Sequence, residues 1–379
     1  MKTIGLNKQD YKLFIRDALN NCLITGGKCN IGCIFCSCKA QNSIGLRNQI
    51  DYISKADIDS IVDYINPNQT IFFGEGTSFL SCEPFSNTEY VDLLEYFNKY
   101  FPNSNKMTTT TGLNINPQDY DRLRKCNISF VISVNTLDQN KRQEIMKSQD
   151  NFYGLIDFLK NCKDIIHKVS LFYFDMKILK SDLEKLNKID SDYITKKQVM
   201  LRLIDYSKFH NQKTQQLHLN AKKTWFKGVE YFDKNVMYPY YWLRSLSDFP
   251  DNIKEINNSI FGIYPARKIF KNKIKEALQF FESNLIDVTK IGFLLAESVY
   301  DYFIIQFPEL KKNAIFVKNN TFGGSYTVAP LLTLNDFINA ILKNKKFNTF
   351  LTSKTIFNWK RDIGGNHIIF DYPFKIYLI

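Results

Sequence analysis

The chain has 379 residues, of which 44% are hydrophobic and 15% aromatic, so it is long enough for a large and a smaller packed domain and is not intrinsically disordered. It has no apolar run of membrane-spanning length and no signal-peptide core at its beginning, so a cytoplasmic protein without membrane association is expected. Its net charge of +12 favours an anionic partner such as RNA, but the lysines are spread along the chain and define no nucleic-acid surface.

Strands and helices alternate through the first half of the chain. Apolar runs predict six strands, at 22–25, 70–73, 106–110, 128–134, 168–174 and 199–203. Stretches with helical periodicity lie between them, at 56–65, 89–100, 118–125, 139–146, 152–161 and 183–189. Six βα units predict an α/β fold, a partial (β/α)6 TIM-like barrel whose chemistry lies at the C-terminal ends of parallel strands.

The second half changes character. Residues 207–285 are basic, aromatic and helical in pattern; such a segment can stack bases, but more often it forms a helix core. Alternation then returns, with strands predicted at 288–293, 314–317 and 326–328 and helices at 297–306 and 334–342. The sequence therefore predicts three parts: a barrel over 1–206, a helical connector over 207–285, and a smaller α/β capping domain over 286–379.

The most informative motif follows the first predicted strand, where Cys29, Cys33 and Cys36 stand in one short loop. Three thiolates can hold three irons of a [4Fe–4S] cluster and leave the fourth iron open to a small molecule. A zinc site with Cys38 as the fourth ligand is the alternative, although structural zinc ligands usually come as two separated pairs. Disulfides between cysteines so close together are not expected in a cytosolic chain.

All eight cysteines lie between Cys22 and Cys162, so the C-terminal half cannot hold a second cluster through cysteine. The cysteines outside the triad are expected to be small buried hydrophobic residues. They are Cys22, Cys38, Cys82, Cys126 and Cys162.

Polar residues and glycines mark the ends of the later strands. Gly74 and Glu75 close the second strand, where a glycine backbone and a carboxylate can accept hydrogen bonds from an amine. Ser133 and Asn135 end the fourth strand on one face and can bind hydroxyl groups, and Arg142 on the next helix can pair with a carboxylate. Ordinary strand-end capping and a surface charge remain the alternatives. Further polar candidates are Thr109, Thr111, Asn114 and Arg202.

The cysteine loop, with Phe35 directly before its third cysteine, resembles the signature of the radical S-adenosylmethionine (SAM) superfamily. Residues 72–76 resemble the Gly-Gly-Glu segment of that family, with Phe73 in place of the first glycine. The resemblance implies that the three loop cysteines ligate the cluster and that the backbone near Phe35 reads the adenine of SAM. It also implies that four side chains position SAM, namely Glu75, Ser133, Asn135 and Arg142.

The same resemblance implies an enzyme that cleaves SAM reductively to a 5′-deoxyadenosyl radical and abstracts hydrogen from a small-molecule or peptide substrate. Its electrons would come from a flavodoxin- or ferredoxin-type donor. Cys82, on the loop after Glu75, is a candidate for returning a hydrogen atom to the product, with a buried loop thiol as the alternative. An RNA-modifying enzyme of the same family, and a non-enzymatic iron–sulfur or zinc sensor or scaffold, remain open.

Two further segments are similar to one group within that superfamily, which has a C-terminal conserved domain of unknown function, usually behind an N-terminal PDZ domain that this sequence does not show. The segments are 133–138, followed by Arg142 and Met146, and 317–333. Thr321 replaces an aromatic residue of the group and Pro330 a glycine. The similarity covers about 20–205 and 285–379, and it implies no particular reaction.

Overall fold

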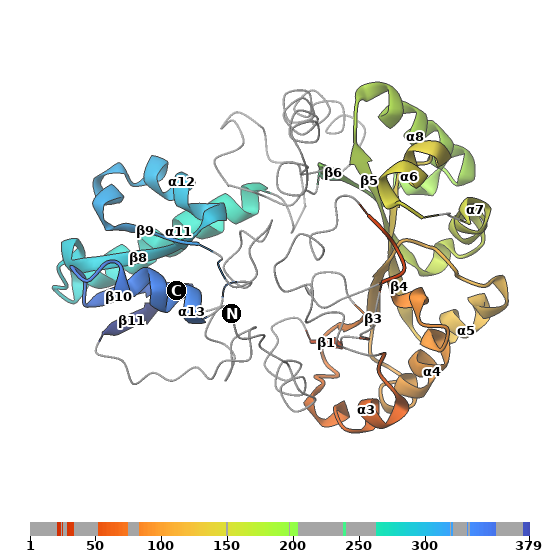
Figure 1. Ribbon diagram of the computed structural model, residues 1–379, viewed down its shortest axis with the longest axis horizontal. Helices are drawn as coiled ribbons and strands as arrows, with labels where there is room; N and C mark the ends of the chain where they lie inside the picture. The colour runs from red at the N-terminus through yellow and green to blue at the C-terminus, as the bar shows by residue number, and fades with distance from the viewer. Residues whose placement is uncertain are drawn as a thin grey trace. The chain divides into compact units, whose positions relative to one another are not determined.

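The computed structural model describes residues 21–23, 25, 29–33, 52–74, 83–148, 151–196, 198–203, 238–239, 263–318, 320, 332, 334–353 and 374–379. The chain divides into two compact units, whose described parts lie within 21–239 and 263–379 (Figure 1). The predicted division at 206 and 285 stays a prediction.

The N-terminal unit is built on a seven-stranded sheet in the order β1-β2-β3-β4-β5-β6-β7, in which every pairing is parallel. The strands are Cys22–Leu23, Ile71–Phe73, Lys106–Thr110, Ile128–Asn135, Ile166–Tyr173, Val199–Leu203 and Tyr238–Pro239. Each strand lies beside its neighbour in sequence, the common arrangement of consecutive βα units. The predicted α/β partial barrel is confirmed, and only β7, which is two residues long, was not predicted as a strand.

The helices of this unit line one side of the sheet (Figure 1). They are α3 (Lys55–Asp59), α4 (Tyr90–Tyr100), α5 (Tyr120–Lys125), α6 (Gln139–Met146), α7 (Phe152–Asn161), α8 (Met176–Ile189) and α9 (Asp192–Thr195), with short 3-10 turns η1 (Val62–Tyr64), η2 (Pro84–Ser86), η3 (Pro117–Asp119) and η4 (Lys163–Ile165). Side-chain caps fix several starts: Asp138 accepts a hydrogen bond from Lys141 N, and Asp175 accepts one from Ile178 N. The Asp175 cap explains why α8 begins seven residues before the predicted helix at 183–189.

Burial along β4 shows which of its faces meets the helices. Phe130 and Ile132 are fully buried, and the ring of Phe130 lies 5.6 Å from that of Phe158 in α7. The register of β4 against β5 shifts between Ile132 and Asn135, so the simple alternation of faces does not extend to Asn135. Ser133 and Asn135 are both buried where the strand ends. At the end of β4 the sheet therefore presents polar side chains.

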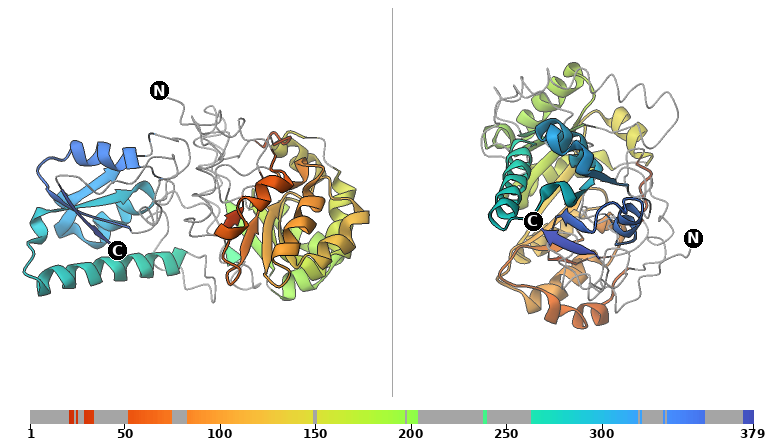
Figure 2. Two further views of the ribbon diagram at one scale, coloured as in Figure 1. Left: turned by 90° about the horizontal axis from the view of Figure 1, so that it is seen from below. Right: turned by 90° about the vertical axis from the view of Figure 1, so that its left-hand side faces the viewer.

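The C-terminal unit contains a four-stranded parallel sheet in the order β11-β10-β8-β9. Its strands are β8 (Ile291–Ala296), β9 (Ala314–Val317), β10 (Thr349–Thr352) and β11 (Lys375–Leu378). One face packs on α11 (Ile263–Ser283) and α12 (Glu297–Gln306), and the other packs on α13 (Leu334–Leu342) (Figure 2). The predicted small α/β domain is confirmed. Its first strand begins at Ile291 because residues 288–290 form a 3-10 turn (η6), and the strand predicted at 326–328 lies outside the described residues. A further 3-10 turn, η7 (Pro308–Asn313), precedes β9.

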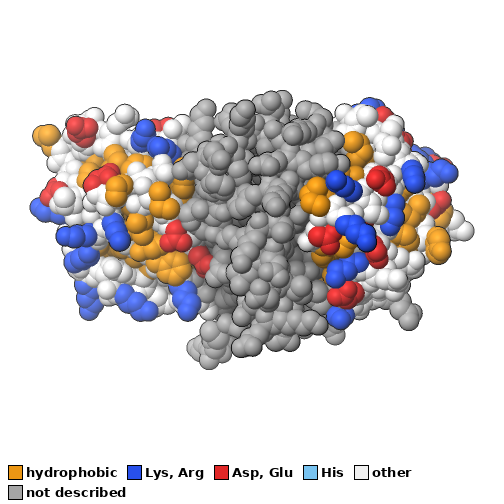
Figure 3. All heavy atoms as spheres, turned by 90° about the horizontal axis from the view of Figure 1, so that it is seen from above, with side chains coloured by type: hydrophobic (Ala, Val, Ile, Leu, Met, Phe, Trp, Pro, Cys, Tyr) orange, Lys and Arg blue, Asp and Glu red, His pale blue; other side chains and the backbone are white. Residues whose placement is uncertain are grey.

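Among the described helices, none is both long and apolar enough to span a membrane. On the face drawn in Figure 3, lysine and arginine side chains of the described residues are scattered and interspersed with acidic ones. This distribution matches the expectation that the lysines are a spread surface charge.

Gly292 in β8 generates a stability prediction. A Cβ at this position would lie 2.6 Å from Ile315 Cδ1 and 2.9 Å from Phe350 Cδ1, so Gly292→Ala overpacks the C-terminal core. We expect it to destabilise this unit by about 1–3 kcal/mol. Hydrogen exchange should rise in peptides of β8–β10 but not in peptides of β3–β5. Leu378→Ala, at an exposed position of β11, is the control, and equal exchange in both variants would contradict the prediction.

Candidate functional site

The described part of the cysteine loop, residues 29–33, lies against the ends of several elements of the N-terminal unit. Cys29 and Cys33 are half-buried thiols that are not joined in a disulfide. They pack on an apolar cluster of Ile31, Leu113, Ile145, Met146, Phe172 and Phe174. These residues come from the loop itself, the segment after β3, α6 and the end of β5, so the loop lies at the carboxyl edge of the sheet, as the sequence predicts. Cys36, Phe35 and Cys38 lie outside the described residues.

Two contacts support this loop. Gly32 lies so close to the residue after α6 that an added Cβ would stand 2.7 Å from Lys147 Cβ and 3.1 Å from Lys147 O. On another side, Ser86 Oγ of η2 donates a hydrogen bond of 2.6 Å to Asn30 Oδ1. The loop is thus held between α6 and η2.

The end of β2 is equally tight. Gly74 has φ +81°, and a Cβ there would lie 2.9 Å from Thr25 Oγ1 and 3.3 Å from Pro84 Cγ. Both the backbone conformation and the close approach require glycine. The neighbouring candidates Glu75 and Cys82 lie outside the described residues.

Asn135 is the most unusual polar residue of the carboxyl edge. It is fully buried with φ +64°, and neither Oδ1 nor Nδ2 of its amide has a hydrogen-bond partner. A buried amide without partners costs free energy, about 1–3 kcal/mol, that a bound ligand can recover. Ser133, two residues earlier, is also buried, and Thr109 lies half-buried near the end of the neighbouring strand β3. An unpartnered amide of this kind fits a ligand with hydroxyl groups.

Arg142 is fully buried, and its guanidinium joins three strand-end carbonyls. Nη1 donates to Ser133 O at 3.1 Å and to Val134 O, and Nη2 donates to Thr111 O at 2.7 Å. The side chain therefore ties α6 to the carboxyl ends of β3 and β4. The sequence predicted a partner for the SAM carboxylate here, and that role stays a prediction.

Glu83 is a buried carboxylate that the sequence did not single out. Its oxygens accept hydrogen bonds from Thr110 Oγ1, from Thr111 N and Oγ1 at 2.8 Å each, and from the backbone of Phe85. Burial raises the pKa of this carboxyl, and the hydrogen bonds oppose the rise. The contacts fix η2 to the end of β3, beside the carbonyl that Arg142 binds. The sequence signal was slight, a glutamate before Pro84 in a loop.

Asp182 in α8 holds the turn that follows Asn135. Its Oδ1 accepts from Thr136 Oγ1 at 3.1 Å and from Leu137 N at 2.9 Å, whereas Oδ2 is buried without a partner. Burial raises the pKa of Asp182 to about 6. A signal existed in the sequence, because Asp182 stands on the apolar stripe of α8, between Leu179 and Leu186.

Two cysteines outside the loop, Cys126 and Cys162, are buried as predicted. Burial raises their pKa values, to about 11 for Cys126 and about 12 for Cys162. The side chain of Cys22, like that of Arg202 in β6, lies outside the described residues.

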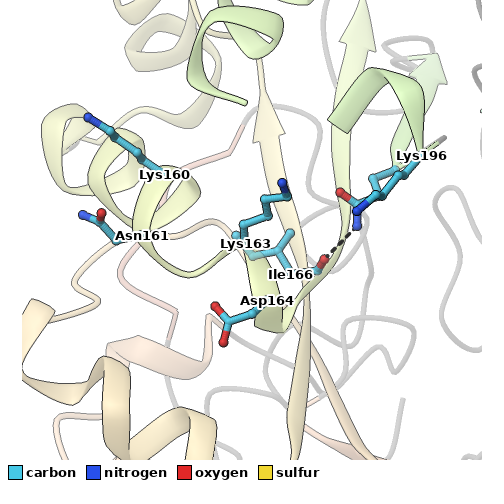
Figure 4. Close-up of a pocket in the computed structure, with 7 residues that line it drawn as sticks. Lys160, Asn161, Lys163, Asp164, Ile166 and Lys196 are labelled. Carbon is cyan, nitrogen blue, oxygen red and sulfur yellow. Dashed lines mark hydrogen bonds between the residues drawn. The ribbon is translucent and has the colours of Figure 1, made fainter. Parts of the chain in front are cut away.

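A surface pocket of about 460 Å³ lies at the opposite edge of the sheet (Figure 4). Ile166 begins β5 and Gln198 directly precedes β6, so the pocket lies at the amino ends of these strands. Lys163 and Lys196, which line it, are paired with Asp192. Chemistry in parallel barrels lies at the other edge, so this pocket is not the candidate active site.

The comparisons with known proteins bear on the same region. The sequence model described as the radical SAM superfamily matches residues 23–186, which run from β1 into α8 and include the cysteine loop and Asn135. Over these residues, which are less than half of the chain, the sequence is similar to the radical SAM superfamily. The cofactors of that superfamily are S-adenosylmethionine and a [4Fe–4S] cluster.

Several solved structures are similar at low identity. SuiB of Streptococcus suis, solved with S-adenosylmethionine, is 14% identical at a TM-score of 0.38, with 64% of this chain and 51% of that chain covered. Methylornithine synthase (PylB) is 10% identical at a TM-score of 0.34, with 70% and 87% covered. The protein anSMEcpe, solved with AdoMet and the Cp18Cys peptide, is 15% identical at 0.36, with 59% and 63% covered.

This chain thus spans about half the length of SuiB. Similarities of this size carry no information on the substrate of this chain. No curated protein matches it significantly.

The buried Asp182 generates a pH prediction. Because its folded pKa is raised to about 6 from 3.8, the folded protein keeps a proton that the unfolded chain has already lost between these pH values. Wild-type stability should therefore fall as pH rises from about 4 to 6, by up to about 3 kcal/mol relative to Asp182→Asn. Lys185 opposes the raised pKa and Asp138 adds to it. Denaturant unfolding at a series of pH values measures the difference, and parallel curves for the two proteins would refute it.

Proposed function

We propose that the chain is a radical SAM enzyme whose active site lies at the carboxyl edge of the N-terminal sheet. Cys29, Cys33 and Cys36 hold a [4Fe–4S] cluster through three thiolates, which leaves one iron open. Ser133 and Asn135 bind the ribose hydroxyls of SAM. The substrate is a small molecule or a peptide, and the electron comes from a flavodoxin- or ferredoxin-type donor.

The observation that carries this proposal is the unpartnered amide of Asn135 at the same sheet edge as the cysteine loop. A structural asparagine at full burial would use its amide for hydrogen bonds within the protein. The family match to residues 23–186 indicates the chemistry in which the cysteine loop and the amide of Asn135 would take part. The residues present therefore fit the cofactors of the family.

The other predicted site residues at the carboxyl edge would have the following roles. Glu75 and the backbone at Gly74 accept hydrogen bonds from the SAM amine, and the backbone near Phe35 contacts the adenine. Arg142 supplies positive charge near the SAM carboxylate while its described hydrogen bonds hold the strand ends. Bound here, the cofactors would supply one-electron reductive cleavage of SAM to methionine and a 5′-deoxyadenosyl radical, which would take a hydrogen atom from a C–H bond of the substrate.

The cluster assignment predicts the outcome of anaerobic reconstitution with iron and sulfide. After dithionite reduction and addition of SAM, wild type should form 5′-deoxyadenosine, and Cys33→Ala should form at most a trace, because one iron ligand is missing. Cys162→Ala, which removes a buried thiol outside the loop, is the matched control and should keep the activity. Chromatography measures the product. A full cluster with no deoxyadenosine from wild type would favour a sensor or scaffold instead.

The assignment of Asn135 predicts that its substitution weakens SAM binding without lowering the stability of the protein. Asn135→Gly keeps the positive φ accessible and removes the unpartnered amide. The unliganded protein should therefore unfold no more easily than wild type, while SAM affinity of the reconstituted protein falls about tenfold. Equilibrium dialysis and denaturant unfolding measure the two effects. A clear loss of stability with unchanged affinity would show that the amide is structural.

A further inference from the structure

Helix α6 contacts the candidate site from its middle to its C-terminal end. Arg142, in the middle of the helix, donates to the carbonyls of Ser133 and Thr111 at the strand ends. Met146, its last residue, packs in the apolar cluster that carries the cysteine loop. Residues four apart lie on one helical face, so Arg142 and Met146 contact the site from the same face of α6, one turn apart.

The contact between the helix and the loop is made by backbone and Cβ atoms. Lys147 caps α6 in the left-handed conformation, with φ 51° and ψ 37°, and its N–H donates to Gln143 O at 2.9 Å. This turn places Lys147 Cβ and O where they leave space only for a hydrogen at Gly32. Flexible side-chain ends can move aside, but a Cβ moves only with its backbone. The distance between α6 and the loop is therefore set rigidly.

A second route joins the same two features on the other side. Asn30 is bonded to Ser86 of η2, and Glu83, just before η2, holds Thr111. The carbonyl of Thr111 in turn accepts from Arg142. The cysteine loop, η2, the end of β3 and α6 thus form a closed ring of contacts around the carboxyl edge.

We propose that α6 is the spacer that fixes the cysteine loop relative to the strand ends where SAM would bind, and that Gly32 and Lys147 are the positioning residues at its loop end. The inference rests on the proposed function, since it assigns the geometry of that same site. Neither residue touches the cofactor in this account. They act through the cysteines on either side of Gly32 and through the rim that Arg142 holds.

The contact suggests a test by suppression. Gly32→Ala adds a methyl group that collides with Lys147 Cβ, so the loop must move although all three cysteines remain. Gly32→Ala/Lys147→Gly removes the opposing Cβ, and glycine adopts the left-handed cap readily. Gly32→Ala/Lys147→Ala keeps that Cβ and removes the rest of the side chain, including the charged amine. The two double variants therefore separate a steric effect from an effect of charge.

The readouts are iron and sulfide content and the change that SAM produces in the electron paramagnetic resonance spectrum of the reduced cluster. Gly32→Ala should lose most of the SAM-induced change and bind SAM about tenfold more weakly, which corresponds to about 1.4 kcal/mol of binding free energy. Gly32→Ala/Lys147→Gly should recover both, and Gly32→Ala/Lys147→Ala should not. Lys147→Gly alone should weaken SAM binding less than Gly32→Ala does, because it opens space beside the loop and adds no collision.

The inference is overturned if Gly32→Ala responds to SAM as wild type does. It is equally overturned if both double variants recover alike, or if neither does. A wild-type protein that assembles a cluster without any SAM-induced spectral change would instead remove the proposed function, so the two failures are distinguishable.

Discussion

The buried guanidinium of Arg142 is the interaction on which the carboxyl edge depends. At the ends of parallel strands, some carbonyl oxygens have no hydrogen-bond partner within the sheet. The buried guanidinium, which has several N–H donors, donates to three of them. The positive charge is compensated by these dipoles, and α6 is fixed to β3 and β4 as a result. The helix then carries the fixed geometry onward to the cysteine loop, one turn away.

Much of this arrangement follows from the sequence. Apolar runs and helical periods located six of the seven strands of the first sheet, and the cysteine spacing predicted the cluster chemistry that is typical of the matching family. The sequence pointed to Gly74 and Asn135 because glycines and polar residues are common where strands end. The sequence could not show which residues contact one another. Nothing in the spacing of Glu83 or Gly32 shows that one holds Thr111 or that the other meets Lys147, since these contacts join distant segments.

Several features of the carboxyl edge raise the free energy of the unliganded protein, and packing elsewhere in the unit offsets them. Asn135 and Lys147 adopt left-handed backbone conformations, and the amide of Asn135 and one oxygen of Asp182 are buried without partners. Each costs on the order of 1–3 kcal/mol in an unliganded protein. Their concentration in one turn and one helix cap is typical of surfaces shaped for a ligand, and the aromatic contacts behind β4 and α7 supply the compensating packing.

The buried thiols of Cys126 and Cys162 have a consequence for how such a protein matures. With pKa values of about 11 and 12, about one in ten thousand or fewer is a thiolate at neutral pH. Thiolates are the species that capture iron and react with peroxide or disulfides. Both side chains should therefore compete weakly for iron and for oxidants in the folded unit, whereas the thiols of Cys29 and Cys33 are only half-buried.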